Sequence, residues 1–205
     1  GYLPSGGRDP RPALLAEANY EGENNVPGSP PTTNETLRRQ ALWALTSGSP
    51  GTFFGSSDWK FAPGWEGRLD TPAVRQLQAI RDFFAARSWW SLVPDEGADL
   101  VTAGRGTEMT HDDPAVFVFG SDYATVAGAA DRSWAIVYVP TERTLTLDLS
   151  RMAGPSTVAW VDPAAAERPR ATAVVDPAGR VSTPGPNSDG GRDWLLLVTA
   201  RHPGS

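Results

Sequence analysis

The chain has 205 residues, a formal net charge of −6 and no cysteine. That length can hold one or two domains with cores of their own, and the acidic balance argues against nucleic acid or an anionic membrane as the partner. The absence of cysteine excludes a disulfide framework and a thiolate metal site, and no apolar run reaches the roughly 18 residues that a membrane-spanning helix needs.

The first predicted element is a short strand of Ala and Leu at residues 13–16 that runs directly into Glu17. A strand without a polar face is typical of a sheet that is covered on both sides. Glu17 ends this strand, ahead of a loop rich in Gly and Asn, and this end of the strand is where parallel α/β barrels carry out their chemistry. The alternative interpretation is an acid that only accepts hydrogen bonds from loop amides.

Two helices and a second strand are predicted between this segment and residue 92. Thr32 and Glu35 have the spacing of a capping box, which opens a helix that ends at Gly48. Residues 51–54 form the next short apolar strand, and Pro72 stands at the first position of a second helix. The order strand, helix, strand, helix predicts parallel strands joined by crossover connections.

From residue 93 onward, short strands alternate with turns. The strands are rich in β-branched and aromatic residues, and Pro and Gly separate them. Several strands at this spacing predict a small antiparallel β-sandwich that closes its own core and forms an autonomous domain. The predicted strands cover residues 116–119, 124–127, 134–139, 144–149, 157–161 and 194–199.

The first part of the chain cannot close a sheet by itself. Two strand–helix units leave both parallel edges open, and an eight-unit barrel needs about 250 residues. We therefore expect the remaining strands either in another polypeptide or in a longer chain of which this one is a piece.

Several motifs, in order along the chain, resemble the apiosidase-like glycoside hydrolase family. LAEANYEG at 15–22, RRQALWAL at 38–45 and GTFFG at 51–55 resemble the end of its barrel, and WWSLVP at 89–94 resembles its domain boundary. AIVYVP at 135–140, WVDP at 160–163 and DWLL at 193–196 resemble its C-terminal β-sandwich, which carries the label of a collagen-binding domain.

The resemblance implies an α/β part followed by an all-β part. Residues 1–92 would be the last two strand–helix units of a (β/α)8 barrel, and residues 93–205 an antiparallel β-sandwich. In such retaining hydrolases the nucleophile ends the seventh strand, which maps onto Glu17, while the acid/base residue comes from an earlier strand with no counterpart here. The isolated chain is therefore expected to be inactive, and the N-terminal barrel portion to be its partner. Ala18 departs from the Pro that the family often has at this position.

Retaining hydrolysis needs two carboxyl groups about 5 Å apart, and Glu17 is the candidate for one of them. Glu21 is expected to bind a sugar hydroxyl or a neighbouring Arg. The loop aromatics suit the C–H faces of sugar rings, although packing under the loop remains open for Trp59. The short polar side chains could fix hydroxyl groups or equally cap turns. The predicted substrate-binding residues are Tyr20, Glu21, Asn24, Asp58 and Trp59.

The expected substrate is a side chain of a plant or microbial polysaccharide, with no cofactor and no metal, in a secreted or periplasmic protein. The acids Asp112, Asp113 and Asp122 do not match an established calcium loop, and His111 and His202 are expected on the surface. The alternative function, of a different class, is a non-catalytic module that binds carbohydrate or protein or serves a structural role.

Overall fold

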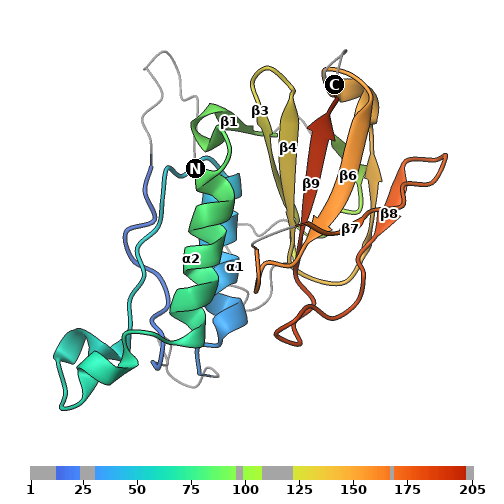
Figure 1. Ribbon diagram of the computed structural model, residues 1–205. Helices are drawn as coiled ribbons and strands as arrows, with labels where there is room; N and C mark the ends of the chain where they lie inside the picture. Colours follow the sequence, from blue (N-terminus) through green and yellow to red (C-terminus); the bar gives the residue numbers. More distant parts are fainter. Residues whose placement is uncertain (1–12, 24–30, 96–98, 108–121, 167–168, 202–205) are drawn as a thin grey trace.

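Two extended segments, two helices and two facing sheets succeed one another across the molecule (Figure 1). The computed structural model describes residues 13–23, 31–95, 99–107, 122–166 and 169–201. The fold is thus mixed, with α-helices in the first part and antiparallel sheets in the second.

The first helix, α1, spans Asn34–Thr46. Its N-cap is Thr33, whose hydroxyl accepts a hydrogen bond from the N–H of Thr36 at 3.1 Å. The prediction of Thr32 as the cap is therefore wrong by one residue, because the Thr32 hydroxyl instead donates to the carbonyl of Glu23 at 2.8 Å. Ser47 is the C-cap, and Gly48 follows it with a φ of 86°, so the helix ends where the sequence predicted.

The second helix, α2, spans Pro72–Ala85 and begins as predicted, with Thr71 as its N-cap and Pro72 at the first position. Its buried face is formed by Ala73, Gln76, Ile80, Phe83 and Phe84. Short 3-10 helices lie at Ser57–Lys60 (η1), Trp65–Arg68 (η2), Trp89–Ser91 (η3) and Leu149–Arg151 (η4).

The predicted strands at 13–16 and 51–54 do not form regular strands; they are parts of two extended segments, residues 13–23 and 51–56, that touch at two isolated bridges. Leu15 pairs with Thr52 and Glu21 with Ser56, and both bridges are parallel, the orientation that the strand–helix alternation predicts. Among the described residues no other strand pairs with these segments, so no continuous ladder forms here. Phe53 is consequently 62% exposed.

The larger sheet has the strand order β1-β3-β4-β9-β6-β7, and the smaller one the order β2-β5-β8, with every pairing antiparallel. The strands are β1 (Leu92–Pro94), β2 (Val101–Ala103), β3 (Thr125–Ala129), β4 (Trp134–Val139), β5 (Thr144–Leu147), β6 (Ser156–Val161), β7 (Pro169–Thr172), β8 (Arg180–Ser182) and β9 (Trp194–Ala200). Five predicted strands correspond to β3, β4, β5, β6 and β9, while the sixth, at 116–119, lies outside the described residues. The four strands that were missed have only three or four residues, too few to show a period.

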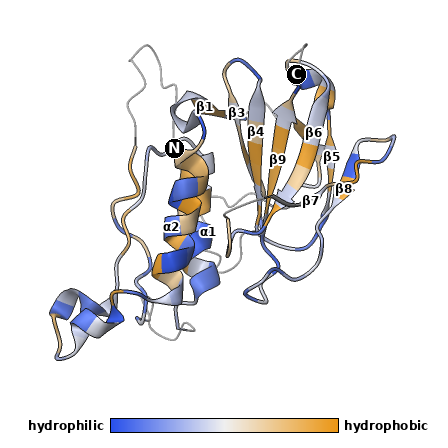
Figure 2. Cartoon of the chain, viewed as in Figure 1, coloured by the Kyte–Doolittle hydropathy of each residue, from blue (hydrophilic) through white to orange (hydrophobic). Residues whose placement is uncertain are grey.

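The larger sheet is covered on both faces. One face packs against the smaller sheet in a core that includes Val137, Leu145 and Leu196, and the other packs against α1 and α2 through Leu42 and Phe83. All six residues of β4 are buried for this reason, and Figure 2 shows the resulting apolar band across β4 and β9. The prediction of an autonomous sandwich did not foresee that helices of the first part cover one face of its sheet. The boundary at residues 92 and 93 stays a prediction.

A buried ion pair joins the helices to the sandwich. The guanidinium of Arg38 on α1 donates two hydrogen bonds to the carboxylate of Asp193, at 2.7 and 2.8 Å, and further ones to Gln76 and Asp189. Arg38 and Asp193 are both 0% exposed. Burial opposes the charge of Arg38, but the hydrogen bonds and the negative charge of Asp193 outweigh it and raise the Arg38 pKa above its ordinary value. This pair therefore has a structural role, because it fixes α1 against the loop that precedes β9.

Within the part of the chain that the structure covers, neither helix has the length and apolar character needed to cross a membrane.

Candidate active site

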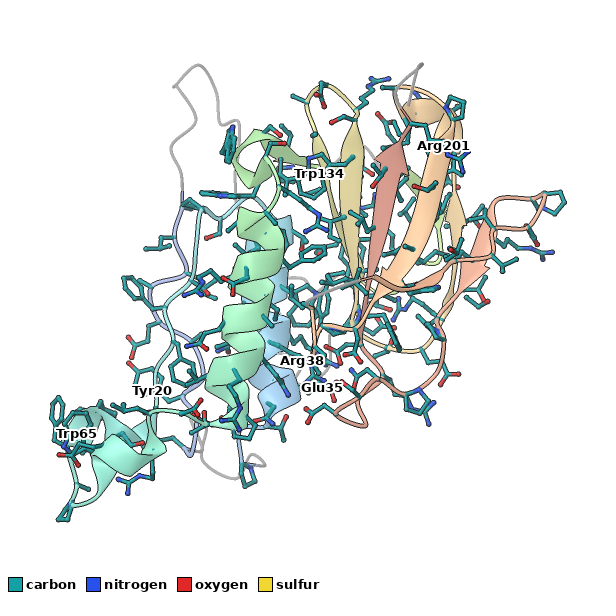
Figure 3. All side chains as sticks on the ribbon, in the orientation of Figure 1. Tyr20, Glu35, Arg38, Trp65, Trp134 and Arg201 are labelled. Carbon is teal, nitrogen blue, oxygen red and sulfur yellow. The ribbon has the colours of Figure 1, made fainter. Side chains whose placement is uncertain are left out.

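Glu17 lies on the surface, at the end of the first extended segment. Tyr20, three residues later, lies toward the end of the molecule where α1 and α2 begin (Figure 3). The hydroxyl of Tyr20 donates to the Glu17 carboxylate at 3.4 Å. The negative charge of Glu17 raises the pKa of Tyr20, and burial and the hydrogen bond add to this effect. The Glu17 carboxylate is thus exposed to solvent and accepts a hydrogen bond from the Tyr20 phenol.

The Tyr20 ring packs against Gly55 of the second extended segment. A Cβ atom added to Gly55 would lie 2.6 Å from two carbons of the Tyr20 ring, so the ring lies directly on the glycine. Residue 55 must therefore be glycine for Tyr20 to keep this position. Together with the contact to Glu17, this packing holds the ring at both ends, and Tyr20 supports the candidate nucleophile.

Glu21 connects the extended segments to α2. Its N–H donates to the carbonyl of Gly55 and its carbonyl accepts from the N–H of Ser57, both at 2.9 Å. Its carboxylate accepts a hydrogen bond from the hydroxyl of Thr71 at 3.0 Å. Because Thr71 caps α2, this contact connects the first extended segment to the start of the helix. The binding of a sugar hydroxyl by Glu21 stays a prediction.

Asp58 joins the two short helices of the loop that follows the second extended segment. It is 9% exposed, and its Oδ1 accepts from Nε and Nη2 of Arg68 at 2.7 and 2.6 Å. The side chain thus links η1 to η2 and shapes the loop. Its predicted role in fixing a substrate hydroxyl stays a prediction.

Trp59 is 58% exposed, so it does not pack under the loop. Its indole N–H donates to Oε1 of Glu23 at 3.1 Å, and the same oxygen accepts from Nζ of Lys60 at 3.1 Å. Lys60 also lies 5.2 Å from the centre of the Trp59 ring. The hydrogen bonds from Lys60 and Trp59 lower the pKa of Glu23. An ionised Glu23 therefore orients the exposed ring.

Sequence reasoning missed Glu23 and Lys60, because Trp59 meets Glu23 across a separation of 36 residues that no local pattern reveals. It also missed Gln40 on α1, whose side-chain amide bonds both the N–H and the carbonyl of Asn19, at 3.1 and 3.0 Å.

The loop that carries these residues ends in a protruding aromatic pair. Phe61 and Trp65 meet edge to face with ring centres 5.2 Å apart, and Phe61 is 68% exposed. Figure 3 shows Trp65 on the part of the loop that projects from the molecule. Phe61 has a φ of 51°, in the left-handed region that bulky residues rarely adopt. Phe61 and Trp59 are thus two exposed rings, two residues apart, on the same loop.

No set of three His, Cys, Asp or Glu side chains that could hold a metal is found among the described residues. Asp122 pairs with Arg143 at 2.9 Å, and a hydrogen bond from the N–H of Thr107 lowers its pKa. The predicted substrate residue Asn24 lies outside the described residues, as do Asp112, Asp113, His111 and His202.

The fold is similar to part of the fold of two solved glycoside hydrolases. A solved glycoside hydrolase superposes with a TM-score of 0.69 at 19% sequence identity, over 93% of this chain and 43% of that one. The crystal structure of a glycoside hydrolase family 5 protein from Bacteroides vulgatus ATCC 8482 superposes with a TM-score of 0.68 at 19% identity, over 93% of this chain and 42% of that one. The chain thus spans less than half the length of these two proteins.

Two family models match separate parts of the chain. Residues 7–91 match the family described as "Apiosidase-like, catalytic domain", and residues 116–199 match "Putative collagen-binding domain of a collagenase". The resemblance expected from the motifs is therefore confirmed: residues 7–91 are similar to the apiosidase-like catalytic domain, and residues 116–199 are similar to the collagen-binding domain. A comparison with the curated proteins found no match.

Proposed function

We propose that this chain is the C-terminal part of a retaining glycoside hydrolase in which Glu17 is the nucleophile. The acid/base carboxyl group would come from barrel strands that precede the chain, at about 5 Å from Glu17. The substrate would be a side chain of a plant or microbial polysaccharide, and the enzyme would be secreted or periplasmic. The isolated chain would then be inactive.

One observation carries this proposal. Glu17 is exposed at the end of a segment that pairs in parallel with the next one, inside the region that matches the apiosidase-like catalytic domain. In barrels, the carboxyl ends of parallel strands form the active-site face. The exposed ring of Trp59, on the loop after the second segment, supports a sugar-binding surface on the same side.

The surface of the helical layer supports an incomplete barrel. A groove of about 690 Å³ runs between α1, α2 and the second extended segment, and apolar side chains line most of it. Its walls include Leu45, Phe54, Leu77, Phe84, Trp89 and Trp90. Phe54 is 40% exposed and Trp90 is 72% exposed. Exposed apolar side chains gathered along one groove mark a surface that binds another part of a protein. We infer that the earlier barrel units cover this groove and pair with the open edges.

The nucleophile assignment is tested in the complete enzyme. Glu17→Gln keeps the side-chain volume but cannot form the glycosyl ester, so we expect kcat to fall by several orders of magnitude while substrate still binds. Glu21→Gln is the matched control, because its carboxylate already bonds Thr71. Azide should partly restore Glu17→Ala and give a product of inverted configuration. If Glu21→Gln is the inactive variant and Glu17→Gln the active one, the assignment is wrong.

A second function, of another class, is favoured by the match of residues 116–199 to "Putative collagen-binding domain of a collagenase". In that case the chain would be a non-catalytic module that binds carbohydrate or protein. Turnover of aryl glycosides by the chain joined to its N-terminal barrel portion, and its loss in Glu17→Gln, would decide for the enzyme. If the joined protein and its Glu17→Gln variant both bind carbohydrate or protein and neither turns over an aryl glycoside, the chain is the non-catalytic module.

A further inference from the structure

The backbone around Glu17 leaves the parallel pairing. Leu15 pairs with Thr52 and Glu21 pairs with Ser56. Along the first segment the two bridge residues are six positions apart, whereas along the second segment they are only four positions apart. The first segment therefore carries two extra residues between the bridges. Such bulges redirect a side chain and free backbone groups from their partners, and they are frequent beside active sites.

Gln40 supplies the partner that the bulge removes. Its Oε1 accepts from the N–H of Asn19 at 3.1 Å, and its Nε2 donates to the carbonyl of the same residue at 3.0 Å. One side-chain amide thus makes both hydrogen bonds that a neighbouring strand would make to Asn19. The amide holds the backbone two residues after Glu17 and one before Tyr20, the residue that bonds Glu17.

The helix that carries Gln40 is fixed to the sandwich by buried contacts. Two positions earlier on α1, Arg38 donates from Nε and Nη2 to the two carboxylate oxygens of Asp193 and from Nη1 to Asp189, and both acids belong to the sandwich. Figure 3 shows Arg38 near the beginning of α1, between the helices and the larger sheet. The helix that carries Gln40 is therefore held by buried contacts, whereas the bulge itself lies on the surface.

We propose that Gln40 is a positioning residue that sets the direction of the Glu17 carboxylate by replacing a strand partner at Asn19. The proposal rests on the proposed role of Glu17 as nucleophile. Gln40 does not touch the reacting atoms; it acts through the backbone and through Tyr20. Small displacements of a nucleophile reduce the rate much more than they reduce binding, so the effect should appear in kcat.

The first experiment uses the chain of 205 residues and the phenol of Tyr20 as its reporter. Tyrosine ¹³Cζ NMR, with Tyr20→Phe to assign the signal, should show a Tyr20 pKa above the ordinary value, since Glu17 raises it. Gln40→Met removes both hydrogen bonds at similar length, and the Tyr20 pKa should fall toward that of Glu17→Gln. The same substitution at exposed Gln78 of α2 should leave it unchanged. A Tyr20 pKa unchanged in Gln40→Met would overturn the proposal.

The second experiment uses the complete enzyme. Gln40→Met should lower kcat by about 10- to 100-fold with little change in KM. In Gln40→Glu the introduced carboxyl group can both accept from Asn19 N–H and donate to its carbonyl only when protonated, so the loss should shrink as the pH falls. A loss confined to KM, or one that does not depend on pH in Gln40→Glu, would overturn the positioning role.

The two proposals fail separately. If Glu17→Gln leaves turnover intact, the nucleophile assignment fails, and the Tyr20 titration still shows whether Gln40 holds the bulge. If Glu17→Gln is inactive but Gln40→Met is fully active, the positioning role alone fails.

Discussion

The larger sheet and the rim around Glu17, meaning the two extended segments and the start of the loop after them (residues 13–23 and 51–60), are held together in different ways. In the sheet, each interior strand pairs on both sides and apolar side chains cover both faces, so that Ile136, Val137 and Leu196 are 0% exposed. At the rim, two bridges and a few side-chain hydrogen bonds hold the extended segments, and Trp59 and Phe53 are 58% and 62% exposed.

This difference shows which part of the chain is complete by itself. Within the described residues, the interior strands of the sheet are paired on both sides and buried once the helices are included, whereas the rim depends on single contacts such as that of Gln40 with Asn19. Local stability follows the number of buried apolar contacts, so the rim is expected to open more readily than the sheet. The following changes test this comparison.

The largest effect is expected when residues 1–91 are removed. The fragment would expose the face of the larger sheet that carries Trp134, Ile136 and Leu197, which α1 and α2 cover in the whole chain. At roughly 1.5–3 kcal/mol for each large apolar side chain exposed, these three alone give a loss of about 4.5–9 kcal/mol. Urea unfolding and binding of a hydrophobic dye measure it. A fragment as stable as the whole chain, with no dye bound, would show that the sandwich is autonomous.

A smaller loss is expected from Arg38→Met. It leaves the Asp193 carboxylate buried without its cation, which costs about 3–5 kcal/mol of unfolding free energy. The matched control is Arg192→Met, which breaks an ion pair with Glu142 in which both side chains are more than half exposed and should cost less than about 1 kcal/mol. Similar unfolding free energies for the two variants would mean that the buried pair does not join helix and sandwich as described.

The smallest change in stability is expected at the rim. In Gly55→Ala the new methyl group meets the Tyr20 ring, which must move, at a cost of about 1–3 kcal/mol. The Tyr20 pKa should then return toward its ordinary value, because the phenol loses the nearby charge of Glu17. Gly67→Ala is the control, since nothing lies within 4 Å of its added Cβ. An unchanged Tyr20 titration in Gly55→Ala would show that the glycine does not set the ring position.

Patterns along the chain were sufficient for the elements whose signals are local. The start of α2 follows from Thr71 and Pro72, because a cap and a fixed φ act within a few residues. The strands from β3 to β6, and β9, follow from runs of β-branched and aromatic residues. The exposed position of Glu17 likewise follows from an acid at the end of an apolar segment.

The contacts that shape the site were decided by the tertiary structure. Gln40 meets Asn19 across 21 residues, Glu23 meets Trp59 across 36, and Glu21 meets Thr71 across 50. The amino-acid sequence determines which side chains can donate, accept or pack, and over short spans it determines the element that each one joins. Which of these groups meet depends on how α1, α2 and the sheets pack together, because that packing alone brings distant segments within hydrogen-bonding distance.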